Sequence, residues 1–246
     1  MTNTILRILI ATALVGACTR ADTATKTATK TTTATANGTV ASAESTTTVA
    51  PGVPTPPPRD SISDRADRGR ILGDTNATVW VVMVSDFQCP YCKLWHDASF
   101  QQVLKTYVNT GRVRMAFLNM PLSMHPNAVP AAEAAMCASV QGKFWPLHES
   151  LFAAQKMWET MPNPIPAFDT LAKVAGVNMV QWRQCVSQHQ TLTLIQADHD
   201  RAAAARINST PAFFVGSQLM IGADADVPKA VEAALAAAAG TKKPGT

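Results

Sequence analysis

The chain has 246 residues, of which 47% are hydrophobic and 15% are charged, and its formal net charge is +4 at pH 7. A chain of this length and composition can form one globular domain with a core and still leave residues outside it. The sequence shows neither a basic block nor basic residues interleaved with aromatic ones, so nucleic-acid binding has no support.

Residues 1–18 resemble an export signal that ends in a lipidated cysteine. Arg7 precedes the apolar stretch 8–14, and the small residues Val15-Gly16-Ala17 stand directly before Cys18. About ten apolar residues are too few to span a bilayer as a helix. The pattern is similar to a bacterial lipoprotein cleavage box, which implies that Cys18 carries a lipid. Ordinary secretion with cleavage nearby is the alternative, and both interpretations place the protein outside the cytoplasm.

Residues 19–64 are predicted to form a disordered tether. Thr and Ala dominate this segment, three consecutive Pro residues stand at 56–58, and large apolar side chains are almost absent. Such a composition cannot drive packing. We expect the tether to hold the domain clear of a membrane surface.

An apolar strand is predicted at residues 78–84, and a pair of cysteines follows it. The strand is apolar on both faces, as expected when helices cover both sides of a sheet. The next helix opens with Cys89-Pro90-Tyr91-Cys92. Residues i and i+3 of a helix lie about 5–6 Å apart, which is close to the Cα separation that a disulfide prefers. The helix is predicted to bury Phe100, Val103, Leu104, Tyr107 and Val108.

The cysteine pair is the candidate active site. Cys89 would face unpaired backbone N–H groups and the positive end of the helix dipole, which both favour a thiolate. We therefore predict that Cys89 is the nucleophile and Cys92 the resolving thiol. Pro90 removes no donor that the first turn needs, and Pro90 with Tyr91 is expected to set which N–H groups reach the sulfur.

Helix formers dominate the middle of the chain, between a second strand at 112–118 and the C-terminal elements. Residues 124–206 are rich in Ala and are predicted to form a helical insertion.

A hairpin and a helix are predicted at the C-terminal end. Apolar runs at 212–215 and 218–221 flank Gly216-Ser217, a two-residue hairpin signal. Asp226 as N-cap and Pro228 near the first position open a last helix.

Several motifs in order make residues 70–239 resemble the DsbA-like branch of thioredoxin-fold proteins. Ser85-Asp86-Phe87-Gln88 leads into the cysteine pair, and Ser209-Thr210-Pro211 precedes the third strand. The remaining motifs lie in or just before the insertion: Pro121-Leu122, His125-Pro126, Ala131-Ala132, Cys137-Ala138, Gln141-Gly142-Lys143-Phe144-Trp145, His148 and Leu151-Phe152. The resemblance implies an α/β thioredoxin fold with an inserted helical domain. The expected parts are a thioredoxin-like domain at 65–123 and 207–240, the insertion at 124–206 and a flexible tail at 241–246.

The resemblance also implies thiol–disulfide exchange outside the cytoplasm. The oxidised pair would accept electrons from cysteines of exported client proteins through a mixed disulfide with Cys89. A DsbB-like or VKOR-like membrane partner would then reoxidise it. In such folds Pro211 is cis and faces the pair, and the backbone of Thr210 pairs with the client. No cofactor is implied, and a monomer is expected.

One position departs from the family pattern. Related domains usually carry a buried Glu or Asp six residues before the first Cys, where it can relay a proton for the second thiol, but this chain has Met83. A general base works only within hydrogen-bond or one-water reach. Asp86 is the nearest candidate in the sequence, although it could equally cap the helix or face solvent.

The remaining cysteines and histidines support no cofactor. Besides Cys18 and the active pair, two cysteines remain, Cys137 and Cys185. In an oxidising compartment two remaining cysteines suggest a disulfide; two buried free thiols are the alternative. Cys89, Cys92 and His96 have a loosely ligand-like spacing, but a closed zinc site needs four ligands. No metal site is predicted, and His96 is expected to be a solvated helix residue.

Two other functions stay open on the sequence alone. A reductase or isomerase would use the same cysteine pair and would be kept reduced by a transmembrane electron donor. A binding module, such as a copper-handling chaperone or a holdase for unfolded exported chains, would need the thiols but no catalysis.

Overall fold

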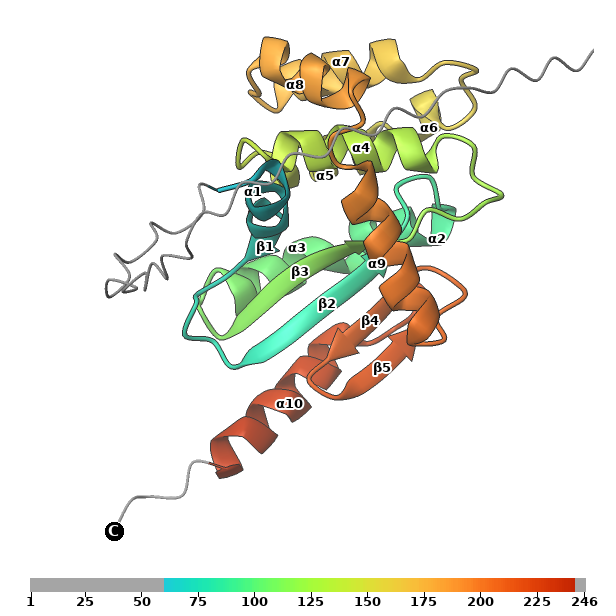
Figure 1. Cartoon of the computed structure of the whole chain (residues 1–246). Helices are drawn as coiled ribbons and strands as arrows, with labels where there is room; N and C mark the ends of the chain where they lie inside the picture. Colours follow the sequence, from blue (N-terminus) through green and yellow to red (C-terminus); the bar gives the residue numbers. More distant parts are fainter. Residues whose placement is uncertain (1–59, 242–246) are drawn as a thin grey trace, which may run out of the picture. The chain divides into compact units, whose positions relative to one another are not determined.

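The computed structural model describes residues 60–241 (Figure 1). The predicted export signal with Cys18 lies outside these residues, as do most of the tether and all but the first residue of the tail. Within the described residues, no helix is both long enough and apolar enough to cross a membrane.

A five-stranded mixed sheet lies at the centre of the fold, in the order β1-β3-β2-β4-β5. Its strands are β1 (Ile71–Leu72), β2 (Val79–Ser85), β3 (Val113–Asn119), β4 (Ala212–Val215) and β5 (Gln218–Ile221). The central strands β2 and β3 pair in parallel, and the other pairs are antiparallel. The predicted hairpin joins β4 to β5, and Gly216 in it has a φ of 58°, which glycine adopts without strain.

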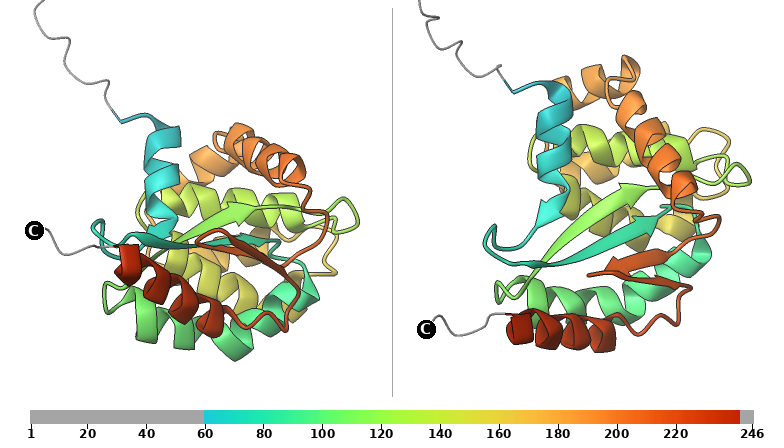
Figure 2. Two further views of the ribbon diagram at one scale, coloured as in Figure 1. Left: turned by 90° about the horizontal axis from the view of Figure 1, so that it is seen from below. Right: turned by 60° about the horizontal axis from the view of Figure 1, so that its bottom comes forward.

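The helical stretch that follows the cysteine pair covers one face of the sheet together with the last helix (Figure 2). It runs without interruption through α2 (Pro90–Trp95), η1 (His96–Phe100), α3 (Gln101–Val103) and η2 (Leu104–Val108). Of the five side chains expected to be buried, four are buried and Leu104 is half-buried. The segments η1 and η2 are π-helical turns, which the sequence did not predict.

The last helix, α10 (Val227–Thr241), begins at the predicted N-cap. The Asp226 side chain accepts a hydrogen bond from the backbone N–H of Lys229 at 3.0 Å. This bond satisfies one of the free N–H groups of the first turn.

The predicted helical insertion consists of six helices: α4 (Ala128–Ser139), α5 (Phe144–Ala153), α6 (Gln155–Trp158), α7 (Ile165–Val174), α8 (Met179–Ser187) and α9 (Leu192–Ala204). The helix α9 packs against β3 on the face of the sheet opposite to α10 (Figures 1 and 2).

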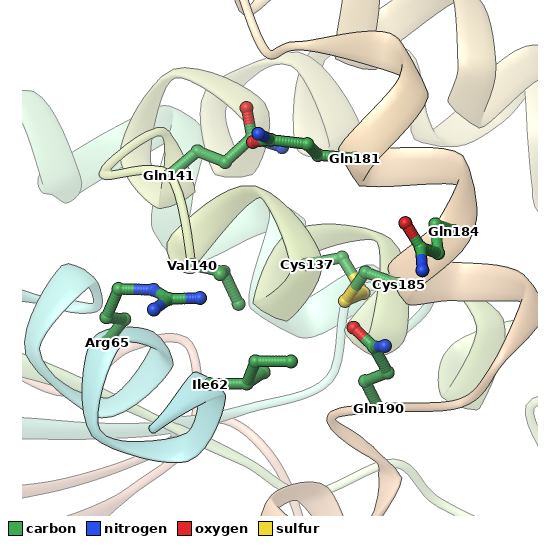
Figure 3. A pocket seen from close by; sticks show the side chains of 9 residues that line it. All are labelled: Ile62, Arg65, Cys137, Val140, Gln141, Gln181, Gln184, Cys185 and Gln190. Atoms are coloured by element: carbon green, nitrogen blue, oxygen red, sulfur yellow. A yellow bond between two sulfur atoms is a disulfide. The ribbon is translucent and has the colours of Figure 1, made fainter. Parts of the chain in front are cut away.

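A disulfide joins Cys137 on α4 to Cys185 on α8, as suggested by the two cysteines that remain besides Cys18 and the active pair. The sulfurs lie at the edge of a polar pocket that also contains Arg65 and four glutamines (Figure 3). The bond closes a loop with a sequence separation of 48 residues. The disulfide therefore restricts the conformations that the unfolded insertion can adopt.

Replacing both Cys137 and Cys185 by alanine should lower the free energy of unfolding by roughly 2–4 kcal/mol, because the unfolded chain regains the entropy of the open loop. Urea denaturation of the oxidised protein and of the variant measures this difference. An unchanged midpoint would contradict it.

A short helix at the N-terminal end was not predicted. The helix α1 (Ile62–Gly69) begins inside the range assigned to the tether, so residues 62–64 are helical and not disordered as expected. A capping box explains its start: the Ser61 hydroxyl accepts the N–H of Asp64 at 3.1 Å, and the Asp64 carboxylate accepts the N–H of Ser61 at 3.0 Å. The C-terminal Gly69 touches α4 so closely that a Cβ atom there would stand 2.3 Å from the Ser139 carbonyl oxygen.

A buried ionic cluster connects the start of β1, the end of β3 and α9. The Asp198 carboxylate is fully buried and accepts hydrogen bonds from the guanidinium of Arg70. It also accepts the backbone N–H of Asn119 at 3.1 Å and its side-chain amide at 2.9 Å. Arg201 adds a contact of 3.1 Å from the surface. The cluster holds the insertion on the sheet.

Candidate active site

The cysteine pair lies where β2 gives way to α2. Cys89 is the N-cap of α2, and Pro90 is its first residue. Only residues 86–89 separate the end of the buried central strand β2 from the start of the helix, which fixes the pair against the core. Both cysteines are free thiols, and each is only 2% exposed.

The pKa values of the two thiols are shifted in opposite directions. The Cys92 thiol donates a hydrogen bond to the Cys89 sulfur, and together with the backbone N–H groups of Tyr91 and Cys92 this lowers the pKa of Cys89 to about 6 against the opposing effect of burial. Burial raises the pKa of Cys92 well above its usual range, and the neighbouring Cys89 sulfur raises it further. Near neutral pH the site therefore holds one thiolate at Cys89 and one thiol at Cys92.

The alkylation rate of Cys89 should consequently rise through pH 6 and reach a plateau below pH 8. The fold lowers the pKa of this thiol to about 6, so the midpoint of its reaction rate lies well below that of a free cysteine, whose thiol has a pKa of about 8.5. Iodoacetamide kinetics followed by mass spectrometry measure this midpoint. A Cys89→Ser variant is the control, and a wild-type midpoint near pH 9 would contradict the lowered pKa.

The predicted second element of the site faces the first. The Thr210–Pro211 peptide bond is cis, as expected, and the carbonyl oxygen of Thr210 lies 3.4 Å from the Cys89 sulfur. Two segments separated by more than 100 residues thus meet at one sulfur atom.

The sequence did not identify Gln155 as part of this site. Its fully buried amide donates hydrogen bonds to the carbonyl oxygens of Phe87 at 2.7 Å and Cys89 at 3.1 Å. It comes from α6 in the insertion and holds the backbone on which the nucleophile sits. No local pattern marks a glutamine for such a contact.

Asp86 neither faces solvent nor caps α2. Its side chain is fully buried, and its carboxylate accepts the backbone N–H groups of Gln88 at 2.7 Å and Leu122 at 2.9 Å. The Nδ1 atom of His125 lies 2.6 Å away. Burial raises the pKa of Asp86, while these hydrogen bonds oppose the rise. The backbone N–H of Asp86 in turn reaches Cys92, with the Ser85 hydroxyl beside it.

An open groove adjoins the thiols. It has a volume of about 450 Å³ and is lined by Tyr91, Leu94, Ser209, Thr210 and residues 221–224. We call α2 and the adjoining turn η1 the redox helix. Tyr91 is 63% exposed and Leu94 57% exposed, so large side chains of the redox helix are exposed to solvent beside the site.

His96 is not the solvated residue that the sequence led us to expect, because it is only 8% exposed. It is the first residue of the π-turn η1, and its ring stacks on Phe152 of α5 and approaches His148 with 5.3 Å between ring centroids. His148 is fully buried, and burial keeps the pKa of its imidazole well below the ordinary value. Hydrophobic periodicity cannot show such an encounter between two distant helices.

Comparison with known proteins identifies the fold family. A family model described as Thioredoxin matches residues 65–236, which is more than half of the chain. The chain belongs to this thioredoxin family. The match spans both parts of the fold and the insertion between them.

Two curated relatives and one solved structure place this thioredoxin-family protein more closely. A probable disulfide bond formation protein D of Bacillus anthracis is 24% identical over 170 residues, which are 64% of this chain and 78% of the relative. The crystal structure of oxidised BdbD from Bacillus subtilis is 25% identical with a TM-score of 0.62, over 69% of this chain and 94% of the other. These likenesses confirm the DsbA-like resemblance and the thioredoxin fold with a helical insertion.

The other curated relative is similar to this protein over only a part of its own length. A Na(+)/H(+) antiporter NhaA 3 of Salinispora tropica is 33% identical over 153 residues, which are 62% of this chain but 22% of the antiporter. The chain therefore spans about a fifth of that relative's length.

Proposed function

We propose that the protein is an extracytoplasmic thiol:disulfide oxidoreductase that oxidises cysteines of exported client proteins. The observation that carries the proposal is the unequal pair of thiols, a thiolate at Cys89 and a thiol at Cys92, beside the cis Pro211. The curated relative named as a probable disulfide bond formation protein D supports the same activity.

The proposed reaction moves two electrons from the client to the cysteine pair. A client thiolate attacks the Cys89 sulfur of the oxidised pair, the Cys89–Cys92 bond breaks, and the Cys92 sulfur takes up a proton. A second client thiolate then attacks the client sulfur of the mixed disulfide. The client disulfide forms, and Cys89 leaves as a thiolate. Because this thiolate is stabilised, its departure is favourable, which favours oxidation of the client.

The apolar groove supports an unfolded client as substrate. An extended chain that reaches Cys89 beside Thr210 would place its neighbouring side chains against Tyr91 and Leu94. Exposed apolar surface next to a reactive group is typical of a binding site for apolar partners.

We also propose that Asp86 with His125 performs part of the role that the buried acid has in related domains. Met83 occupies the usual position of that acid and is buried in β2. The Asp86 carboxylate is anchored by His125, and the N–H of the same residue reaches the Cys92 sulfur. The contact between Asp86 and His125 would therefore position the backbone N–H group that stabilises the Cys92 sulfur when it leaves.

Replacing Asp86 by asparagine should slow formation of the mixed disulfide about tenfold, because the N–H group would be held less firmly against the leaving Cys92 sulfur. It should also shift the pH profile, because a buried titratable carboxyl group is removed. Stopped-flow kinetics with a dithiol peptide between pH 5 and 9 measure both changes. Asp169→Asn, which alters an exposed ion pair with Arg183, is the matched control. A slower rate with an unchanged pH profile would assign Asp86 a structural role only.

The direction of exchange follows from the reduction potential of the Cys89–Cys92 pair. A value near −120 mV would support an oxidase, whereas one near −270 mV would contradict it and favour a reductase or isomerase. Equilibration with glutathione redox buffers measures the potential.

The location and partners are part of the proposal. We place the reaction outside the cytoplasm, with the protein tethered through Cys18. A membrane partner would reoxidise the cysteine pair and so complete the catalytic cycle. Labelling of the expressed protein with a radioactive fatty acid, compared with Cys18→Ser, tests the anchor.

A further inference from the structure

We propose that His96, His148 and Glu149 form a binding site for a divalent transition-metal ion of the zinc class, between the redox helix and α5. One potential ligand atom from each residue lies within 4.8 Å of the other two. The site lies outside the cysteine pair, so it does not depend on the proposed function.

Unpaired ring nitrogens mark the site. Among the described residues, neither nitrogen of His148 has a hydrogen-bond partner, and neither does the Nε2 atom of His96, although all three atoms are buried. A buried polar atom without a partner costs about 1–3 kcal/mol, and native structures rarely leave one without an ion or a water molecule. One ion would bind the Nε2 atom of His96 and one of the two His148 nitrogens, so these unpaired atoms indicate an occupant.

The residues around the site orient the ligands. The Nδ1 atom of His96 lies 3.2 Å from the Asp97 carboxylate, which fixes the proton on Nδ1 and leaves the lone pair of Nε2 free. The Gln101 amide donates to Oε1 of Glu149 at 2.7 Å, so that Oε2 is free and lies 3.8 Å from His96 Nε2. A carboxylate behind a histidine and a hydrogen bond behind a carboxylate are the usual outer partners of metal ligands.

The donor set fits the zinc class. Two imidazoles and one carboxylate are a zinc donor set that leaves a fourth position open. Ligand atoms about 2.1 Å from one ion lie about 3.4 Å apart in a tetrahedral site, so the present separations need only small side-chain movements. Glu149 can supply them, because its side chain is 39% exposed. The π-turn that presents His96 is itself a feature common at functional sites.

The ion would connect two parts of the fold. His96 lies one helical turn after Cys92, whereas the other two ligands belong to the insertion. Zinc should therefore tighten the contact between the redox helix and α5. The probe for this is Zn²⁺ itself.

The test uses the full chain with Cys18, Cys89 and Cys92 all replaced by serine, so that no free thiol binds metal. After treatment with EDTA, calorimetric titration with Zn²⁺ should show one ion per chain. His96→Gln and Glu149→Gln should each weaken binding more than the roughly 10–100-fold expected when only an outer partner such as Asp97 is removed. Co²⁺ should give the visible spectrum of a site without sulfur ligands.

Two controls keep the result interpretable. His189→Gln removes a histidine that lies 2.8 Å from Glu133 elsewhere in the insertion, and it should leave zinc binding unchanged. Zn²⁺ should raise the thermal unfolding midpoint of the protein with the three serine replacements, but not that of the same protein with His96→Gln. This comparison remains informative if variants of His148 fail to fold. No saturable binding, as expected if water occupies the site, would overturn the proposal. An unchanged affinity in His96→Gln and Glu149→Gln would do the same.

Discussion

A Cys89→Ser variant should lose thiol–disulfide exchange, with a rate at least about a thousandfold lower, or about 4 kcal/mol in the barrier. Serine cannot form the mixed disulfide, and the thiolate that the structure stabilises is removed with the sulfur. Oxidation of a dithiol peptide, followed by fluorescence, measures the rate. Retained function in this variant would refute catalysis and favour a binding module.

A Cys92→Ser variant should behave differently. Its remaining Cys89 can still attack a disulfide peptide, but the resolving thiol is absent, so the mixed disulfide should persist and be visible by mass spectrometry without reductant. The same variant would capture from an extract those proteins that carry a reactive disulfide. The double variant of Cys137 and Cys185 to alanine is the matched control, because it lacks a disulfide but keeps the active pair and should retain exchange.

An Asp198→Ala variant should lose about 3–5 kcal/mol of stability, the cost of leaving one partner of a buried ion pair without the other. Arg70 would stay buried with only the partly exposed Asp67 as a carboxylate partner, and the N–H and amide of Asn119 would lose their acceptor. Urea denaturation measures the change. Asp198→Asn, which keeps the shape and some hydrogen bonds, should fall between the alanine variant and the wild type.

The control for this prediction is an exposed ion pair. Asp169→Ala removes the partner of the solvent-exposed Arg183 and should cost much less, since water and salt screen such pairs. A loss in Asp198→Ala no larger than in Asp169→Ala would contradict the importance of the buried cluster.

The elements that the sequence predicted correctly carry local signals. The strand before the cysteine pair, the β4–β5 hairpin and the cap at Asp226 each depend on hydrophobic period, turn residues or a capping side chain within a few positions. The pairing of Cys137 with Cys185 followed from counting cysteines in a chain expected to be exported.

The elements that were missed lack such signals. The helix α1 buries only Ala66 among its own residues, and β1 has two residues, so neither produces a clear period. His96 was wrongly expected to be solvated: it stands four residues before the buried Phe100, and its ring is covered by Phe152 of α5.

The amino-acid sequence alone was sufficient to identify the redox pair, its place at the start of a helix after a central strand, and the helical insertion. These features depend on covalent spacing and on local periodicity. The tertiary structure alone showed that Asp86 is buried against His125, that Gln155 holds the backbone of the nucleophile and that His96 meets His148. These contacts join segments far apart in the chain, and their energies depend on burial and distance, which exist only after the chain has folded.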